Sequence, residues 1–559
     1  MSIGQSVRAG MLVWVMGLSA LALALAGRAA PQAAGEVREF RNPVLRGYHA
    51  DPTICRVGED YYLATSSSEY FPGLPIYHSR DLVNWRLIGH ALHRPGQIDL
   101  TGVENSKGVF APTLRHHAGI FYLVTTLVGA PARSGNFIVT ATNSAGPWSD
   151  PIWLEDAPGI DPSLFFDDDG RVYYCGNRRP EKMIDGSHRL VWVQEIDVRA
   201  GRLIGPRTEF DPAPLYATQA IGPVGWLEAP HLYRRGGWYY LLVSHGGTWL
   251  DHAVSFWRSR SPLGPWEMNP ANPVLTHRRE RPPGITSTGH ADLVQTPGGE
   301  WWAVLLAIRG ETGKSVMGRE TFLCPVDWTG EWPVFNAARR PGRVELSLPA
   351  PTLTPGPLDS AATRHRAMDG AGAGPEGWVT VRVPRADWLK VEPGTGRLRL
   401  TASPDALTAP VGQPSARLRR VTEERFGLRG IVEFEPTQEG ARAGLTILRA
   451  RDAVWLLAVE QVGGARVASV YRGETRMGML RVAQAGPVEL RMELRARRLE
   501  FLVREAGAGW RTVATEDATA LATSEAGRFT GTMAGIFAQA SEPVEAVFER
   551  VEWQPGEDR

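Results

Sequence analysis

Residues 48–67 read YHADPTICRVGEDYYLATSS, and this stretch contains the unit from which the first 330 residues are built. The unit starts with Asp51 and Pro52, passes through a β-favouring segment and a glycine-containing turn, and ends in an aromatic pair at Tyr61. Branched and aromatic residues on both sides of such a turn predict two antiparallel strands. Asp51 stands at the entrance to the first strand, where burial of an unpaired carboxylate is unfavourable. Asp51 therefore needs a role that folding alone does not supply.

Four further copies of this unit follow along the chain. They are APTLRHHAGIFYLVTT (111–126), DPSLFFDDDGRVYYCG (161–176), APHLYRRGGWYYLLVS (229–244) and ADLVQTPGGEWWAVLL (291–306). Nine residues separate the first proline, or the aligned Asp292, from the aromatic pair in all copies except 161–176, where eleven do. Successive copies start 60, 50, 68 and 62 residues apart, which suits one four-stranded blade per repeat. The repeat predicts an all-β fold in which residues 37–345 form a five-bladed β-propeller.

The starts of three copies carry an acid. The first strand of each propeller blade lines the central channel, so the residues at these starts face one cavity. Asp51, Asp161 and Glu228 occupy three starts, and the other two offer Phe110–Ala111 and His290–Ala291. Acids that converge from distant strands favour a functional site, and a pair with one ionised and one protonated carboxyl is the apparatus of glycoside hydrolysis. The alternative is that one or more of the acids caps a turn or binds a metal ion.

Around these residues the chain resembles glycoside hydrolase family 43. The similar segments lie within residues 40–340 and read GYHADPTICRVGEDYYLATSSSEYFPGLPIYHSRDLVNW, GIDPSLFFDDDGRVYY, WLEAPHLYRRGGWYYL, GHADLVQTPGGEWWAV and GRETFLCPVDWTGEWPVF. The resemblance implies an inverting enzyme in which Asp51 is the general base and Glu228 the general acid. It also implies that Asp161 raises the pKa of the acid and orients it.

The same resemblance implies the surroundings and the substrate of the site. Arg319 and His290 are expected to contact the substrate, and an aromatic wall is expected near Phe110. The implied activity is exo-acting β-xylosidase on xylo-oligosaccharides, with α-L-arabinofuranosidase on arabinose-containing hemicellulose as the alternative. A carbohydrate-binding propeller without catalysis is the alternative from another class. No metal ligands are assigned and no cofactor is required, although a calcium ion near the propeller axis, as in some relatives, stays open.

A second domain is predicted after the propeller. Residues 346–375 are rich in Pro, Gly and Ala and are typical of a linker. Residues 376–555 show period-two alternation, as in VELRMELRARRLEFLV (488–503), which indicates strands with one apolar face. This pattern predicts a β-sandwich, and the segment resembles the C-terminal domain of many family 43 xylosidases. We expect an accessory domain that packs on the propeller and shapes the rim of its site, against an independent carbohydrate-binding module.

The N-terminus is different in kind. Arg8 precedes an uncharged apolar run at residues 11–26, which is short for a membrane span of roughly 20 residues. Together with small residues near its end, the run predicts a signal peptide within residues 1–30, with an uncleaved anchor as the alternative. We therefore expect a secreted protein, periplasmic or extracellular, with no membrane association after cleavage.

Charge and cysteine content exclude several classes of protein. The 559 residues include 61 basic and 60 acidic side chains, so nothing indicates a nucleic acid or anionic membrane partner. Cys55, Cys175 and Cys324 are isolated in the sequence, which argues against a disulfide framework and against a zinc site. The oligomeric state is left open by the sequence.

Overall fold

The computed structural model describes residues 38–212, 225–278, 284–310, 314–353, 377–436, 438–495, 497–522 and 528–556. Apart from one short 3₁₀ turn, η1 (Thr519–Ala522), the regular elements of these residues are strands. The predicted signal peptide and most of the predicted linker lie outside the described residues. Within the described ranges, no helix has the length and apolar character needed to cross a membrane. The cysteines are buried and free.

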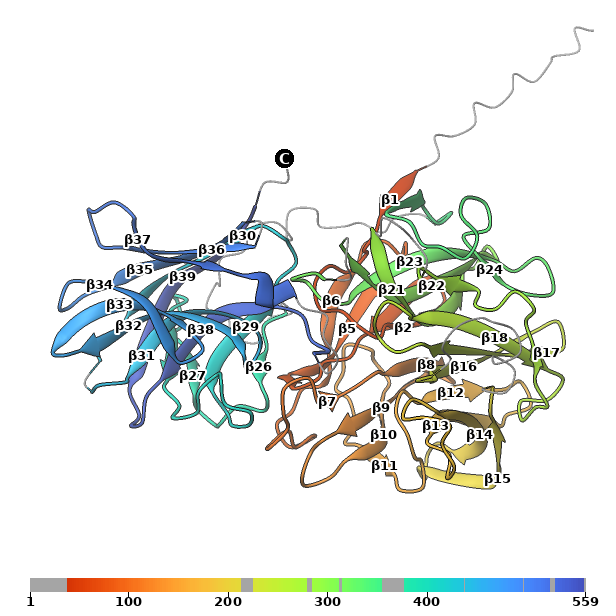
Figure 1. Cartoon of the computed structure of the whole chain (residues 1–559). Coiled ribbons are helices and arrows are strands. Elements are labelled where there is room, and N and C mark those ends of the chain that lie inside the picture. The colour runs from red at the N-terminus through yellow and green to blue at the C-terminus, as the bar shows by residue number, and fades with distance from the viewer. Residues whose placement is uncertain are drawn as a thin grey trace, which may run out of the picture. The chain divides into compact units, whose positions relative to one another are not determined.

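Five antiparallel sheets follow one another from residue 53 to residue 335, and each is one blade of a propeller (Figure 1). Blade one contains β2 (Thr53–Val57), β3 (Asp60–Ala64), β5 (Gly73–Ser79) and β6 (Arg86–Leu92), and blade two contains β7 (Gly108–Val109), β8 (Thr113–His117), β9 (Ile120–Val128), β10 (Gly135–Ala141) and β11 (Ile152–Leu154). Blade three contains β12 (Ser163–Phe166), β13 (Val172–Arg178), β14 (Leu190–Asp197) and β15 (Arg202–Phe210). Blade four contains β16 (Glu228–Arg235), β17 (Trp238–His245), β18 (Ala253–Ser259), β19 (Glu267–Met268) and β20 (Leu275–Thr276), and blade five contains β21 (Ile285–Gln295), β22 (Trp301–Arg309), β23 (Glu320–Asp327) and β24 (Val334–Phe335).

The repeat seen in the sequence is the first hairpin of each blade. Its five copies form the antiparallel pairs β2–β3, β8–β9, β12–β13, β16–β17 and β21–β22. The first strands of these hairpins contact one another in a closed ring, from β2 through β8, β12, β16 and β21 back to β2. The buried apolar clusters lie mainly between neighbouring blades. The predicted five-bladed propeller is therefore confirmed.

The segment that precedes blade one, from residue 39 to residue 42, contacts blade five and the strand that follows it. Strand β1 (Glu39–Arg41) pairs with β25 (Ser347–Pro349), which follows the last blade. The Asn42 side chain donates to the backbone oxygen of Leu323 in β23 at 2.9 Å. These contacts connect the two ends of the propeller sequence.

A polar network crosses the ring of inner strands. Asp292 of β21 is fully buried and accepts hydrogen bonds from Arg115 of β8, Thr53 of β2 and Tyr233 of β16 at 2.6–3.0 Å. Arg115 also donates to Nδ1 of His231 at 3.1 Å. Burial would raise the pKa of Asp292, but Arg115 and His231 outweigh burial and lower it far below its usual range. The network therefore joins four of the five blades around the carboxylate of Asp292, whose charge is balanced by Arg115.

The C-terminal part forms a two-sheet sandwich (Figure 1). One sheet has the order β27 (Leu389–Val391), β28 (Leu398–Thr401), β39 (Glu545–Pro555), β30 (Phe426–Glu433), β35 (Val488–Arg495), β36 (Arg498–Arg504) and β37 (Arg511–Asp517). The other has the order β29 (Ser415–Arg420), β38 (Met533–Gln539), β31 (Arg442–Ala450), β32 (Ala453–Val462), β33 (Ala465–Arg472) and β34 (Thr475–Arg481). The alternation in β35 has the expected effect, because Val488, Leu490, Met492 and Leu494 are all buried in the core. The predicted sandwich is therefore confirmed.

Residues of the sandwich region contact blade one and its surroundings. Strand β4 (Tyr70–Phe71) pairs with β26 (Thr380–Val381). The buried guanidinium of Arg420 donates from Nε to the backbone oxygen of Tyr48 at 2.7 Å, and that of Arg382 donates to the oxygen of Val103 at 2.5 Å. Charged donors to buried carbonyls make strong hydrogen bonds. These contacts are the ones expected of an accessory domain that packs on the propeller.

Candidate active site

Residues beside the starts of four of the repeat copies have unusual backbone conformations. Asp51, Asp161, Ala229 and His290 have φ angles of 58°, 53°, 48° and 51°, in the left-handed region that residues other than glycine rarely adopt. Each directly precedes the proline of its repeat or, in blade five, Ala291. Strain of this kind persists where the surrounding structure enforces it, and it is concentrated at functional sites. The same unusual conformation thus recurs in four blades, just ahead of β2 and β12 and within β16 and β21.

Three carboxyl groups and one imidazole meet at this end of the ring. Asp161, Glu228 and His290 each place a side-chain oxygen or nitrogen within 4.8 Å of the others. Nδ1 of His290 lies 3.6 Å from Oδ1 of Asp51 and 3.9 Å from Oε1 of Glu228. All four residues are at most 9% exposed. The structure therefore brings together the three acids that the repeat placed at the channel, and we call these four residues the acid cluster.

Asp51 is held ionised by its neighbours. Arg319, which directly precedes β23, donates from Nη1 to Oδ1 of Asp51 at 2.6 Å. Burial alone would raise the pKa of Asp51, but Arg319, His290 and a hydrogen bond from Ser66 outweigh burial and lower it. Asp51 is therefore a carboxylate at neutral pH, in the state that can accept a proton.

His290 is the cation of the cluster. Burial alone would lower the pKa of His290, but Asp51, Glu228 and Asp161 around the ring raise it to about 9. The backbone nitrogen of His290 donates to Oγ of Ser244 at 2.8 Å, and Ser244 lies opposite Glu228 in the β16–β17 pair. Blades four and five are thus joined directly beside the cluster. The positive imidazole lies close to both Asp51 and Glu228.

Asp161 has the opposite electrostatic character to Asp51. Burial raises the pKa of Asp161 well above its ordinary value, and the nearby Glu228 and Asp51 carboxylates raise it further, against His290 and Arg319. The resemblance implies that Asp161 acts on the neighbouring acid Glu228, and this role of Asp161 stays a prediction. Two carboxyls this close titrate as a pair. The cluster thus favours the protonated form of Asp161 while Asp51 remains ionised, and pKa values pushed apart in this way separate an acid from a base.

Calcium is a poor fit to the acid cluster. Calcium takes six to eight oxygen ligands. The cluster offers the carboxylates of Asp161 and Glu228 together with an imidazole, and the raised pKa of His290 leaves that imidazole without a lone pair at neutral pH. The expectation of calcium near the axis is therefore not supported by these three residues and stays a prediction for the rest of the axis.

The expected aromatic wall has a partner from the sandwich region. The ring of Phe110 packs edge-on against Phe529, with centroids 6.1 Å apart. The backbone oxygen of Phe529 accepts a hydrogen bond from Nη2 of Arg319 at 3.0 Å, and the guanidinium carbon lies 5.8 Å from the Phe529 ring. Arg319 thus connects Asp51 on the propeller to Phe529 on the sandwich. The C-terminal region therefore contributes directly to the surroundings of the acid cluster.

Three residues beside the cluster were not predicted from the sequence. Ser66 hydrogen-bonds to Asp51, and the backbone oxygen of Phe529 accepts a hydrogen bond from Arg319. Nε2 of His252 lies 3.8 Å from Oε1 of Glu228. Ser66 is in the first repeat, but its hydroxyl has no distinguishing motif. His252 and Phe529 lie in connections outside the repeated hairpin, so the repeat contained no signal for them.

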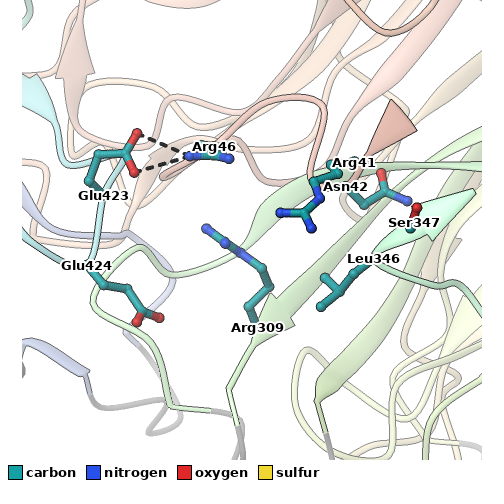
Figure 2. A pocket seen from close by; sticks show the side chains of 8 residues that line it. All are labelled: Arg41, Asn42, Arg46, Arg309, Leu346, Ser347, Glu423 and Glu424. Atoms are coloured by element: carbon teal, nitrogen blue, oxygen red, sulfur yellow. Dashed lines mark hydrogen bonds and ion pairs between the residues drawn. The ribbon is translucent and has the colours of Figure 1, made fainter. Parts of the chain in front are cut away.

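A separate cavity of about 310 Å³ is lined by none of these residues. Figure 2 shows Arg41, Arg46 and Arg309 lining it together with Glu423 and Glu424 from the sandwich region. Arg46 pairs with Glu423 at 3.1 Å, and Arg309 pairs with the buried Glu320 at 2.7 Å. Most of its positive charge is thus neutralised by neighbouring carboxylates. The cavity contains no member of the acid cluster and has no reacting pair of its own.

Comparison with known proteins agrees with this geometry. Residues 40–333 match glycosyl hydrolases family 43, and residues 373–554 match the β-xylosidase C-terminal concanavalin A-like domain. A xylosidase/arabinosidase of Butyrivibrio fibrisolvens is 35% identical over 512 residues, which cover 89% of this chain and 96% of that protein.

Two further relatives extend the comparison. A non-reducing end α-L-arabinofuranosidase of Bacteroides ovatus is 37% identical over 438 residues, 78% of each chain. The crystal structure of a xylan β-1,4-xylosidase from Bacillus halodurans has a TM-score of 0.83 and 31% identity, and the match covers 92% of this chain and 99% of that one. With the propeller, the sandwich and the acid cluster, these matches show that the chain is a glycoside hydrolase and belongs to glycosyl hydrolases family 43.

Proposed function

We propose that the protein is an inverting exo-glycosidase that removes terminal β-D-xylosyl residues from xylo-oligosaccharides. One observation carries the mechanism: in a single buried cluster, the pKa of Asp51 is lowered while that of Asp161 is raised. Hydrolysis with inversion needs one carboxylate to activate water and one carboxyl to protonate the departing oxygen. The cluster supplies both states at the same pH.

The proposed steps follow from the charges. Asp51, kept ionised by Arg319, takes a proton from the attacking water as its oxygen bonds to the anomeric carbon. Glu228 gives its proton to the glycosidic oxygen as the bond from that oxygen to the sugar breaks. Asp161, which is next to Glu228 and has a raised pKa, keeps a proton available to the pair. Water and these groups supply every atom and proton, so the reaction as proposed needs no cofactor.

The substrate class is supported by the relatives. Two of the three are named as acting on xylosides, one of these also as an arabinosidase, and the third is named as an α-L-arabinofuranosidase. The latter name supports α-L-arabinofuranoside hydrolysis as the second candidate. A binding propeller without catalysis is disfavoured, because sugar binding alone does not need acids whose pKa values differ in this way.

A panel of nitrophenyl glycosides tests the substrate. We expect turnover of the β-D-xyloside, with a lower rate on the α-L-arabinofuranoside. Proton NMR of the first sugar released from the β-xyloside should show the α-anomer before mutarotation. No turnover of any pentoside contradicts the proposed function, and the β-anomer as first product contradicts the inverting mechanism.

The exo mode has its own test. Early in the digestion of xylotriose we expect xylose and xylobiose as products, because the sugar is taken from one end of the chain. Mixtures of oligomers released from polymeric xylan at early times would contradict it.

The roles of the two acids are separable by substrate. Glu228→Gln should slow substrates with poor leaving groups by about 10²–10⁴-fold and spare activated aryl glycosides, which leave with little protonation. Asp161→Asn should shift the alkaline limb of the pH–rate profile to lower pH, because the last proton shared by two neighbouring carboxyls is held more tightly than the proton of a single carboxyl. Equal losses on both kinds of substrate would contradict the assignment of Glu228.

We also propose secretion to the periplasm or the medium, on the basis of the apolar run at residues 11–26. N-terminal sequencing of the protein from its native host should find a start near residue 31. A protein that retains residue 1 would contradict cleavage.

A further inference from the structure

His252 is buried beside Glu228 in the connection between β17 and β18. Its side chain is fully enclosed. The Nδ1 atom contacts the backbone oxygen of Gly247, and the backbone oxygen of His252 accepts a hydrogen bond from Oγ1 of Thr276 at 3.0 Å. The ring and the backbone of His252 are thus fixed from two directions.

The contact with Gly247 determines the tautomer. A carbonyl oxygen only accepts hydrogen bonds, so Nδ1 of His252 is the nitrogen that carries the hydrogen. Burial lowers the pKa of His252 to about 4; Glu228 acts against this effect, and the charges of His290 and Arg319 add to it. The imidazole is therefore neutral at neutral pH, and its Nε2 presents a lone pair.

That lone pair faces Glu228. Nε2 of His252 lies 3.8 Å from Oε1 of Glu228, and among the described residues neither atom has a hydrogen-bond partner. His290, the other group near this oxygen, is 3.9 Å away, too far for a direct hydrogen bond. Two buried acceptors that face each other are unfavourable unless one of them carries a proton. A protonated Glu228 resolves the arrangement, either by a small closure of the gap or through one bridging water.

The backbone of β21 is shaped around this ring. A Cβ atom at Gly289 would lie 1.7 Å from Cδ2 and 2.0 Å from Nε2 of His252. Gly289 has no positive φ, so it is glycine here because of space and not because of its conformation. The close packing shows that the imidazole of His252 occupies a site shaped for it, beside Gly289, which directly precedes His290.

We propose that His252 is a positioning residue for the general acid: its Nε2 lone pair accepts the proton of the Glu228 carboxyl and holds that carboxyl protonated and oriented between turnovers. The inference rests on the proposed role of Glu228. When Glu228 gives its proton to the glycosidic oxygen, the carboxylate formed faces a lone pair, and this arrangement favours its reprotonation. His252 thereby opposes the positive His290, which favours the ionised carboxylate.

The test compares His252→Phe with His252→Gln. Phenylalanine keeps the ring volume without an acceptor, whereas the amide oxygen of glutamine reaches about as far as Nε2. For His252→Phe we expect the alkaline limb of kcat/KM to fall by about one pH unit, the size of one lost hydrogen bond. At neutral pH we expect about tenfold lower kcat on xylobiose and little change on dinitrophenyl xyloside, because only the poor leaving group needs the acid. His252→Gln should restore part of both effects.

Thr276→Val is the matched control, because it removes the hydrogen bond to the His252 backbone and leaves the imidazole in place. It should lower the melting temperature without moving the alkaline limb. Equal losses on both substrates in His252→Phe, or an unmoved alkaline limb, would overturn the proposal.

A second measurement does not depend on activity. In protein labelled with ¹⁵N-histidine, the His252 signals, assigned by their loss in His252→Phe, should show a neutral ring with hydrogen on Nδ1. Hydrogen on Nε2 would overturn the proposal. Failure of the proposed function is recognised separately, as the absence of turnover of any pentoside by the unaltered enzyme.

Discussion

The inner strands carry two layers of buried polar groups that are built in opposite ways. In the acid cluster, Oε1 of Glu228 has no hydrogen-bond partner among the described residues, and the backbone of the other three residues is strained. Two residues after His290 on β21, Asp292 accepts hydrogen bonds from three side chains and two backbone nitrogens. Both layers contain buried aspartates.

The difference shows what buried charge is used for in each place. Arg115 stabilises the ionised form of Asp292, so the second layer contributes to folding. In the acid cluster, the pKa of Asp161 is raised, which means that folding makes its ionisation harder. The acid cluster lowers the stability of the fold and the network around Asp292 raises it. The fold can therefore hold reactive carboxyls in a rigid channel.

The largest effect that separates the layers is expected from Asp51→Asn. Loss of the base should lower kcat/KM about 10²–10⁴-fold on every substrate, because water must be activated whatever the leaving group. The apparent melting temperature should fall less than in a variant of the second layer, because Asp51 is paired with Arg319 through one hydrogen bond, whereas Asp292 accepts hydrogen bonds from three side chains. Steady-state rates and a thermal melt check both parts. A melting temperature lowered as much as by a change in the second layer would remove the distinction.

Asp292→Asn should show the reverse pattern. It leaves the guanidinium of Arg115 buried beside a neutral partner, and breaking a buried pair costs about 3–5 kcal/mol of unfolding free energy. The folded fraction should keep most of its kcat at low temperature. Chemical denaturation gives the free energy of unfolding, and rates measured at the same temperature give kcat. Loss of kcat without loss of stability would show that the network acts on catalysis.

The two aspartates should also differ in the sign of their pH dependence. Asp292 has a depressed pKa, so its stabilisation is present above the unfolded value of about 3.9 and is lost as the pH falls. Asp161 has a raised pKa, so its folded form is favoured at low pH and loses stability as the pH rises above about 3.9.

Asp161→Asn should therefore raise the melting temperature at pH 7 by about 1–2 °C, because about 1 kcal/mol shifts the melting temperature of a chain of this size less than that of a small domain. The gain over the unaltered protein should shrink toward pH 4. Melts across this pH range test it, and a gain that grows toward acid pH would reverse the assigned sign.

The smallest effect is expected where the sandwich region meets the cluster. Phe529→Ala removes the ring that packs on Phe110 but keeps the backbone oxygen that accepts from Arg319. We expect KM to rise a few fold, about 1 kcal/mol of lost contact, with kcat nearly unchanged. Arg319→Lys is the comparison, because a lysine cannot bridge both acceptors, and it should lower kcat much more. Equal effects of the two changes would contradict the assignment of substrate contact to the Phe529 ring and of Arg319 positioning to the Phe529 backbone oxygen.

Much of the propeller could be predicted because its repeat is local. The spacing from Pro52 to Tyr61 recurs in other copies, and each copy is one hairpin whose strands pair with each other. The equivalence of the strand starts then placed Asp51, Asp161 and Glu228 at one cavity. These inferences needed only the order of the strands along the chain.

The surroundings of the cluster could not be predicted in the same way. His252 lies in the connection between β17 and β18 and Phe529 lies in the sandwich region, both outside the repeated hairpin, and 210 residues separate Phe529 from Arg319. Which carboxyl has the raised pKa depends on distances to His290 and Arg319, and a sequence contains no such distances. Interactions between unrelated loops are therefore the part that required coordinates.

The hydrogen bond from Arg319 to the backbone oxygen of Phe529 bears on how such enzymes tolerate change. Every amino acid has this oxygen, so the bond survives any substitution at 529 that keeps the path of the chain. An insertion or deletion of one residue beside it shifts the oxygen by about 3.5 Å, beyond the reach of a fixed guanidinium. Hybrids that join the propeller of one relative to the sandwich of another should thus be selected for the length of this loop before its sequence.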